Sequence, residues 1–445
     1  MFSRRNHRPK SAALPKSAAL LDAWRSLDTG DVPGALRQVR AAGENQPREE
    51  VALVIGRAAA AAGFDDLRDA SATLAAAPED ATALYRFGYA CVERGLDDLA
   101  VPPLREALRL SPGSFAVVHE LVAAYESQGL HRDAVELLTG YEKSFSDWPE
   151  RYLLVHNAIL SGDLELARRQ HALLPAPPDP QWLAPRDRQN RMLERAASAA
   201  GTTSLDGTDL RGWQFVIGGT LLGTLSPYGF TAGMTGRYAF LQDSYAQCLL
   251  GLQRLRSLLA AAEVAPRSVS LLPGRGSRIL GLAAAEVLGL PARPFRPGEP
   301  ETVVIAYDLA EVAEEDGGRE ALLGLVERAP GQVLHEHASC WTDAPGVAAD
   351  SVTLLHQSVV APWAEQLRAG AGGDVERGPA DGRPAEALAA EVVGADPTPA
   401  PGDGDSPGDP AEVLEAFAAG VRDSWLRGPR RGLSSSGPVR SSRFA

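Results

Sequence analysis

The stretch from Ala81 to Ser114, ATALYRFGYACVERGLDDLAVPPLREALRLSPGS, decides the fold of the N-terminal half of the chain. Apolar and small residues recur at helical spacing on both sides of Gly95, so we expect two antiparallel helices joined by a glycine turn. Pro112 ends the second run, because proline cannot continue a helix. The expected core positions are Leu84, Phe87, Gly88, Cys91, Ala100, Leu104 and Ala107.

Glycines in the same local setting recur along this half of the chain. The intervals between them are 33, 32, 34 and 33 residues, and a small residue stands five positions after most of them. This pattern resembles the tetratricopeptide family, in which pairs of antiparallel helices repeat with a period near 34. The resemblance covers residues 17–174 and implies an all-α solenoid of about five helix pairs. The glycines are Gly30, Gly63, Gly95, Gly129 and Gly162.

Arrays of this family bind a protein or peptide in a concave groove lined by the first helix of each pair. Projecting the expected helices places aromatic, histidine and arginine side chains on or near that face, and such side chains carry binding energy at interfaces. The alternative is that Tyr85 and Tyr89, four residues apart, only pack along their own helix. The candidate groove residues are Arg57, Tyr85, Arg86, Tyr89, His119, Tyr152 and His156.

The amino-acid composition limits the classes of partner that we expect for this chain. The chain has 445 residues, with 57 acidic against 44 basic side chains and a net charge of −13, which argues against nucleic acid and anionic membrane surfaces. No apolar run is long enough to span a bilayer, so no membrane partner is expected. Three widely spaced cysteines fit a reducing compartment, and we predict a cytoplasmic protein. The richness in arginine, alanine, glycine and proline is typical of bacteria with high-GC genomes.

No lysine follows Lys143, which excludes from the second half a Walker-type phosphate loop, a Schiff base to pyridoxal phosphate and a lysine-dependent kinase site. From residue 205 short apolar runs alternate with helical segments, a pattern that predicts an α/β domain with a mainly parallel sheet. The expected parts of the chain are a disordered basic N-terminus (1–16), the helical array (17–174), a linker with a bridging helix (175–204), the α/β domain (205–368), a flexible acidic linker (369–409), an amphipathic helix docking on the α/β domain (410–427) and a disordered tail (428–445).

Loops that leave the carboxyl ends of parallel strands form the ligand crevice of such a sheet. The loop PGRGS at 273–277 joins an expected strand to a helix, and it resembles, weakly, the corresponding loop of phosphoribosyltransferases. A nucleotide or phosphorylated ligand could bind there at the positive end of the helix. The structural alternative is an ordinary strand-to-helix turn. The residues of this candidate anion loop are Gly274, Arg275, Gly276, Ser277, Arg278 and, on the next loop, Asp308.

A third loop contains His335, His337 and Cys340, residue types that bind zinc or iron or that pair a thiol nucleophile with a base. The two histidines would lie on one face of a strand, with the cysteine just beyond. Fewer than four strong ligands lie together, so we predict no metal and no cofactor, with these three residues as the weak metal candidates.

Two functions remain open. The first is a scaffold or adaptor that binds a protein or peptide through the helical array, without catalysis in the second half. The second is an enzyme or sensor whose α/β domain binds a nucleotide or phosphorylated ligand, which requires the loops at Gly274, Asp308 and His335 to open into one pocket. No residue is identified as catalytic, and the first function is preferred.

Overall fold

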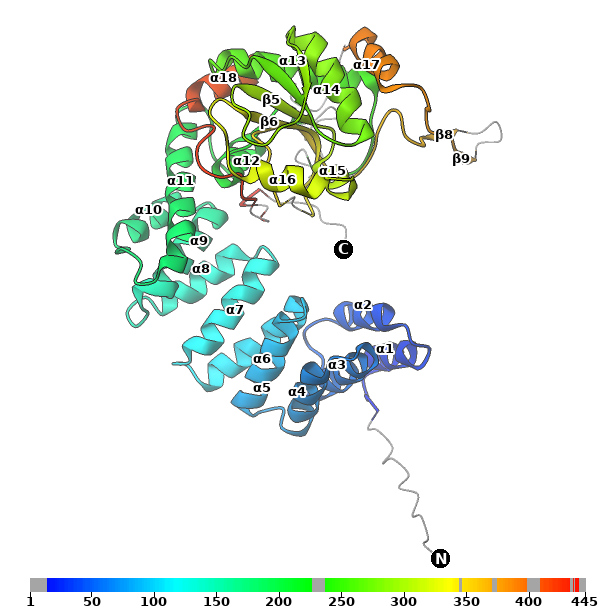
Figure 1. The fold of residues 1–445 in the computed structure, drawn as a ribbon. Helices are drawn as coiled ribbons and strands as arrows, with labels where there is room; N and C mark the ends of the chain where they lie inside the picture. The colour runs from blue at the N-terminus through cyan, green and yellow to red at the C-terminus, as the bar shows by residue number, and fades with distance from the viewer. Residues whose placement is uncertain are drawn as a thin grey trace, which may run out of the picture. The chain divides into compact units, whose positions relative to one another are not determined.

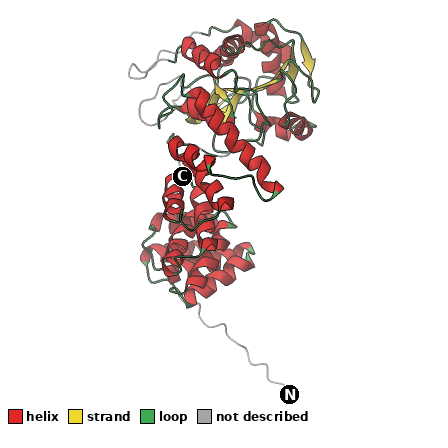
Figure 2. Ribbon diagram, turned by 90° about the vertical axis from the view of Figure 1, so that its left-hand side faces the viewer, coloured by secondary structure: helices red, strands yellow, loops and turns green. Residues whose placement is uncertain are grey.

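The computed structural model describes residues 14–225, 237–343, 346–369, 374–397, 409–432, 435 and 437–439. The chain forms two compact units, Met1–Ser146 and Asp147–Ala445 (Figure 1). Figure 2 shows that the described strands belong to the second unit, and the first consists of helices. Most of the predicted basic N-terminus, two pieces of the predicted acidic linker (370–373 and 398–408) and half of the predicted tail (433–434, 436 and 440–445) lie outside the described residues.

The first unit contains four successive helix pairs, and each helix packs on its partner and each pair on the next. This confirms a helical N-terminal part. Its helices are α1 (Ala18–Asp28), α2 (Val32–Ala42), α3 (Arg48–Ala62), α4 (Asp65–Ala76), α5 (Ala81–Val92), α6 (Asp97–Leu110), α7 (Phe115–Ser127) and α8 (His131–Gly140). A fifth pair, α9 (Tyr152–Ser161) and α10 (Leu164–Ala172), belongs to the second unit. The short helix η1 (Asp147–Arg151) precedes it.

The periodic glycines explain why these helices pair. All five have a positive φ, between +66° and +87°, a conformation that glycine adopts without the steric cost of a Cβ. Inside α5, Gly88 lets α6 approach closely, because a Cβ added there would lie 2.5 Å from the Leu104 Cγ. The other core positions expected from the sequence are at most 1% exposed.

The second unit is built on a parallel sheet in the order β1-β7-β6-β5-β3-β4, with β2 also pairing with β7. The predicted mainly parallel sheet is therefore confirmed. The strands are β1 (Leu221–Leu222), β2 (Arg237–Gln242), β3 (Ser268–Leu271), β4 (Ala292–Pro294), β5 (Thr302–Ala306), β6 (Val333–Cys340) and β7 (Ser351–Val360). A separate antiparallel pair consists of β8 (Leu367–Ala369) and β9 (Val375–Arg377).

Helices cover both faces of this sheet (Figure 1). On one face α13 (Tyr245–Ala261), α14 (Arg275–Leu288) and α17 (Ala385–Gly394) pack on one another, and on the other face α15 (Leu309–Glu314) and α16 (Gly318–Val326) form a pair. The remaining elements are η2 (Pro180–Trp182), α11 (Leu183–Ala199), α12 (Leu210–Gly218) and α18 (Ala411–Val421), and α18 packs against α11 and α13.

Two segments differ from the sequence-based expectation. Within the expected flexible linker, α17 buries Leu388 and Val392 against α13 and α14. Within the expected disordered tail, the Arg430 side chain is buried and bound to Asp350. Both segments are flanked by Gly, Pro, Asp and Arg, a composition typical of linkers. They are nevertheless ordered because tertiary contacts stabilise them, which the local sequence does not reveal.

We predict that Gly88→Ala lowers the free energy of unfolding of the first unit by about 1 to 3 kcal/mol, because its methyl group overlaps Leu104. Alanine is otherwise the better helix former, so helix propensity alone would give the opposite sign. The matched control is Gly113→Ala, where no atom lies within 4 Å of the added Cβ. Thermal unfolding followed by circular dichroism checks this; equal midpoints for the two variants would contradict close packing at Gly88.

Candidate functional site

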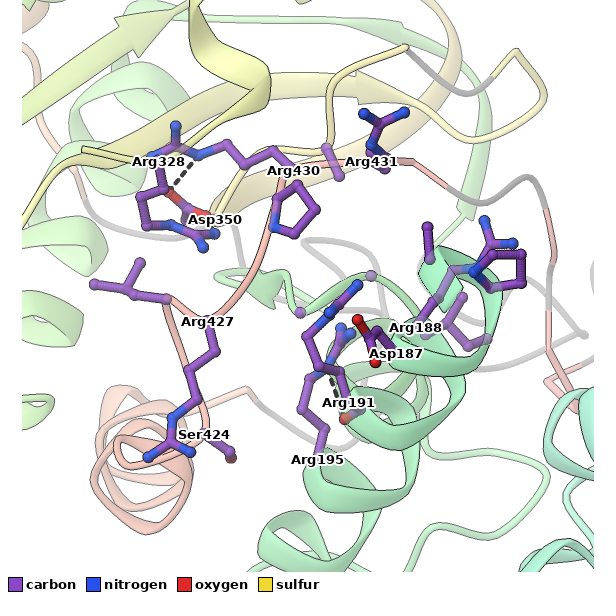
Figure 3. Close-up of a pocket in the computed structure, with 18 residues that line it drawn as sticks. Asp187, Arg188, Arg191, Arg195, Arg328, Asp350, Ser424, Arg427, Arg430 and Arg431 are labelled. Carbon is purple, nitrogen blue, oxygen red and sulfur yellow. Dashed lines mark hydrogen bonds and ion pairs between the residues drawn. The ribbon is translucent and has the colours of Figure 1, made fainter. Parts of the chain in front are cut away.

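A pocket of about 320 Å³ opens in the second unit between α11, the end of α12, the start of β7 and the segment that follows α18. Figure 3 shows arginines entering it from two sides, α11 and the segment after α18. Seven arginines and two aspartates line it, although the chain as a whole is strongly acidic. We call this site the arginine pocket; its charged residues are Arg188, Arg191, Arg195, Arg328, Arg427, Arg430, Arg431, Asp187 and Asp350.

Arg195 is the most unusual of the arginines that line the pocket. Its side chain is buried, with 7% exposure, yet it forms no ion pair with a carboxylate of the described residues. Its guanidinium donates only to two backbone carbonyls, those of Arg191 and Phe215, both at 3.2 Å. Burial, together with the nearby Arg191 and Arg328, lowers the pKa of Arg195 to about 9. A buried cation without a counter-charge is costly, so an anion in the pocket would relieve a real penalty.

Four more arginines of the pocket, Arg188, Arg191, Arg427 and Arg431, form no ion pair with any carboxylate that the structure describes. The Nε atom of Arg188 is also buried without a hydrogen-bond partner. Five guanidinium groups thus line the pocket without an ion pair; Arg427 and Arg431 are exposed residues, and Asp187 is the other carboxylate of the lining besides Asp350. Such an arrangement is suited to an anion with several oxygen acceptors, since guanidinium groups bind phosphate and carboxylate through paired hydrogen bonds.

The local sequence explains both walls. On α11 the spacing of Arg188, Arg191 and Arg195 is three and four residues, which places them on one face of the helix. On the other side the chain turns at Gly428, whose φ is +72°. A Cβ at this glycine would lie 2.7 Å from the Arg191 Cδ, so only glycine lets this segment pass so close to α11.

The opposite wall is fixed by Asp350, which lies just before β7. Its carboxylate accepts hydrogen bonds from the Arg430 Nε, at 2.9 Å, from Arg328 and from the Leu334 amide. Burial alone would raise the pKa of Asp350, but Arg430 and Arg328 outweigh it and hold the pKa below its ordinary value. Asp350 therefore stays ionised and is already occupied by two of the seven arginines.

The predicted anion loop is arranged differently. Arg275 donates to the carbonyls of Asp381 and Arg383, at 2.5 and 2.9 Å, and Arg278 forms an ion pair with Glu386 at 2.8 Å. Both arginines therefore hold the segment that leads into α17. The Ser277 hydroxyl is buried and accepts the Tyr307 amide.

Carboxylates surround the same loop. A Cβ at Gly276 would lie 3.1 Å from a Glu311 carboxylate oxygen, and one at Gly274 would lie 3.2 Å from the Glu315 Cγ. Asp308 caps α15 through the Ala310 amide, and burial raises its pKa. Burial also raises the pKa of Glu311 to about 7. Above that pH the carboxylates place negative charge at the start of α14, which opposes the binding of an anion there.

On β6, His335 and His337 share one face, but they have different partners. The His335 Nδ1 lies 2.9 Å from the Ser351 Oγ and its Nε2 lies 3.3 Å from the Thr353 Oγ1, while burial lowers the pKa of His335 to about 3. His337 instead meets Asp243 and Cys248, which come from the loop before α13 and from α13.

Cys340 does not join these histidines. It lies an odd number of residues from His337, and side chains alternate along a strand, so its thiol points to the other face, toward the Gln357 carbonyl at 3.6 Å. The three weak metal candidates, His335, His337 and Cys340, therefore do not come together. Cys248 could not be recognised as a neighbour of His337 from the sequence, because about ninety residues separate the two.

The candidate groove residues of the first unit lie on three helices. Arg57 on α3 stacks on Trp24, 4.6 Å from the ring centroid, and forms an ion pair with Asp28. On α5 the rings of Tyr85 and Tyr89 are 6.2 Å apart, and Tyr89 is 43% exposed.

The other groove candidates divide between the two units. Arg86 is exposed on α5, and the half-buried His119 on α7 lies 6.4 Å from the Phe115 ring. Tyr152 and His156 belong to the second unit, where Tyr152 is 6% exposed and stacks on His156 and Trp148. Tyr152 therefore has little surface to offer a ligand.

Comparison with known proteins gives no match, neither to a protein-family model nor to a curated protein. Among the helices described, none is both long and apolar enough to cross a bilayer.

We predict that Asp350→Asn lowers the free energy of unfolding of the second unit by about 3 to 5 kcal/mol, since it leaves Arg430 buried without a counter-charge. Because the folded pKa of Asp350 is depressed, its contribution is present above the unfolded pKa of about 3.9 and is lost as the pH falls through the folded value. Unfolding by denaturant at pH 7 and at pH 3 checks both statements.

The control is Asp316→Asn, at an exposed position outside this network. The difference between wild type and Asp350→Asn should shrink at the lower pH. A variant as stable as wild type at pH 7 would contradict the role given to Asp350.

Proposed function

We propose that the second unit binds a small anionic ligand of the phosphate class in the arginine pocket. The observation that carries this proposal is Arg195, a buried guanidinium whose only described partners are backbone carbonyls, beside four further arginines without ion pairs. The volume of about 320 Å³ is at the lower end of the range for small-molecule sites, roughly 300 to 1,000 Å³. It suits a phosphorylated metabolite or part of a nucleotide better than a large ligand.

The pocket favours a binding role over a catalytic one. Its charged groups are arginines and two aspartates, and Asp350 is held ionised by Arg328 and Arg430. No histidine, cysteine or lysine is among the residues that line it. The arginine pocket is therefore equipped mainly to recognise negative charge, and its remaining polar side chains besides Asp350 and the arginines are Asp187 and Ser424.

We further propose that the helix pairs of the first unit are a tetratricopeptide-type array that binds a protein or peptide. The period near 34 and the positive φ of Gly30, Gly63, Gly95 and Gly129 support the family assignment. The exposed Tyr89, with Tyr85 and Arg86 on the same helix, offers the side-chain types that carry interface energy. The protein is then an adaptor with a protein-binding unit and a ligand-binding unit.

We predict that the full chain binds pyrophosphate or inorganic phosphate and that Arg191→Ala weakens the affinity about ten-fold. One charge-assisted interaction is worth about 1.5 kcal/mol or more, and 1.4 kcal/mol corresponds to a factor of ten. Isothermal titration calorimetry at low ionic strength measures this, and added salt should weaken binding by screening. Arg191 is half-buried and has no ion pair to lose within the described structure, so the variant should fold.

The matched control is Arg319→Ala, which removes the same charge from a side chain that is 81% exposed on α16. Its affinity should equal that of wild type. Absence of binding by wild type, or equal binding by wild type and Arg191→Ala, would refute the anion site.

For the first unit we predict that Tyr85→Ser combined with Tyr89→Ser abolishes capture of a partner protein from an extract of the native cell while leaving the unfolding midpoint within a few degrees. The control is Leu323→Ser, at a 74% exposed apolar position in the second unit. Quantitative pull-down compares the three proteins. If every protein captured by wild type is also captured by the double variant, the tyrosines do not form the binding surface.

A further inference from the structure

Three donor atoms of the second unit converge in the interior, on the face of the sheet covered by α13. The Asp243 Oδ2 lies 3.0 Å from the His337 Nε2 and 3.4 Å from the Cys248 Sγ, and the thiol lies 3.8 Å from the same Nε2. All three side chains are buried. None of them lines the arginine pocket.

This geometry differs from that of a nucleophile with its base. In such a triad the base uses one ring nitrogen for the nucleophile and the other for the orienting carboxylate. Here the carboxylate and the thiol both approach Nε2, and the His337 Nδ1 is buried without a hydrogen-bond partner. The three ligand atoms therefore surround one point, and they do not form a chain along which a proton could pass from thiol to imidazole to carboxylate.

The separations fit a tetrahedral metal ion. Ligand bonds of about 2.0 to 2.3 Å imply distances between ligand atoms of about 3.3 to 3.8 Å in a tetrahedron. The observed separations of 3.0, 3.4 and 3.8 Å bracket that range. A carboxylate, a thiolate and a neutral imidazole are also the donor types that Zn²⁺ takes in proteins.

We propose that Asp243, Cys248 and His337 bind a divalent transition-metal ion of the Zn²⁺ class. The two negative charges of the carboxylate and the thiolate match the charge of the ion, which removes the cost of burying them uncompensated. Further contacts orient the carboxylate. The Ser244 amide donates to the Asp243 Oδ1 at 2.8 Å, and the Tyr307 hydroxyl donates to the Oδ2 at 2.9 Å.

The neighbouring residues define the coordination. His335, two residues earlier on the same strand, is engaged by Ser351 and Thr353, so it is not a fourth ligand. The Tyr307 hydroxyl is a further oxygen beside the cluster, 2.9 Å from the Asp243 Oδ2, and its ring lies 5.4 Å from that of His337. Ligands from the loop before α13, from α13 and from β6 would let the ion join a helix to the sheet, as a structural site does.

The test uses the full chain, stripped of metal with a chelator and titrated with Co²⁺, which reports its ligands by absorption. We expect one equivalent to bind, with a near-ultraviolet band from thiolate to cobalt and visible bands of tetrahedral intensity. Zn²⁺ should displace these bands and raise the unfolding midpoint, because it binds the folded state alone. Absence of the thiolate band in the wild-type protein would overturn the proposal whether or not any variant folds.

Two variants locate the site. Cys248→Ser should lose the thiolate band and weaken Co²⁺ binding at least ten-fold, whereas Cys340→Ser, on the other face of β6, should behave as wild type. A band that survives in Cys248→Ser, or one that disappears in Cys340→Ser, would assign the metal elsewhere. If Cys248→Ser does not fold, His337→Gln gives the same decision, since it should keep at most a weak band with altered visible absorption.

Discussion

The buried ion pair between Asp350 and Arg430 holds together the part of the second unit on which the arginine pocket depends. The Asp350 carboxylate also binds Arg328 and the Leu334 amide, and its carbonyl accepts the Trp425 indole at 3.0 Å. One residue just before β7 thus connects β6, the loop after α16 and the segment that follows α18. Arg430 adds bonds to the Gln332 side chain and to the Leu325 carbonyl.

The arginines of the pocket have two different roles in this network. Two arginines neutralise Asp350 and fix the C-terminal segment, while the remaining arginines face the pocket without ion pairs to described carboxylates. Like charges on one face of α11 oppose folding, and the proposed anion would offset that cost on binding.

The N-terminal fold could be predicted from sequence because its cause is local and periodic. Each glycine that turns the chain, such as Gly95, stands at a fixed distance from the next, and core residues such as Leu104 follow at helical spacing. The parallel sheet was predictable for a similar reason, since strands and helices alternate along the chain. The order of the strands was not, because it depends on pairing between distant segments.

The sites could not be predicted in the same way. The arginine pocket joins α11 to residues near Arg430, which are more than two hundred positions away and which have the composition of a loose tail. For the histidines of β6, strand alternation separates Cys340 from His337, while the true neighbour, Cys248, comes from a helix far away in sequence. Neither site could be predicted, and the reason is the same for both. The side chains of each site meet through tertiary packing between distant segments, which a local sequence pattern does not encode.

Anion binding in the arginine pocket is tested most directly by crystallography of the full chain soaked with tungstate, a tetrahedral oxyanion that is located by its anomalous scattering. We expect an anomalous peak in the arginine pocket within hydrogen-bond distance of Arg191 and Arg195, and loss of that peak when pyrophosphate competes. A pocket with no peak, or a peak at the loop around Gly274 instead, would contradict the assignment of anion binding to these arginines.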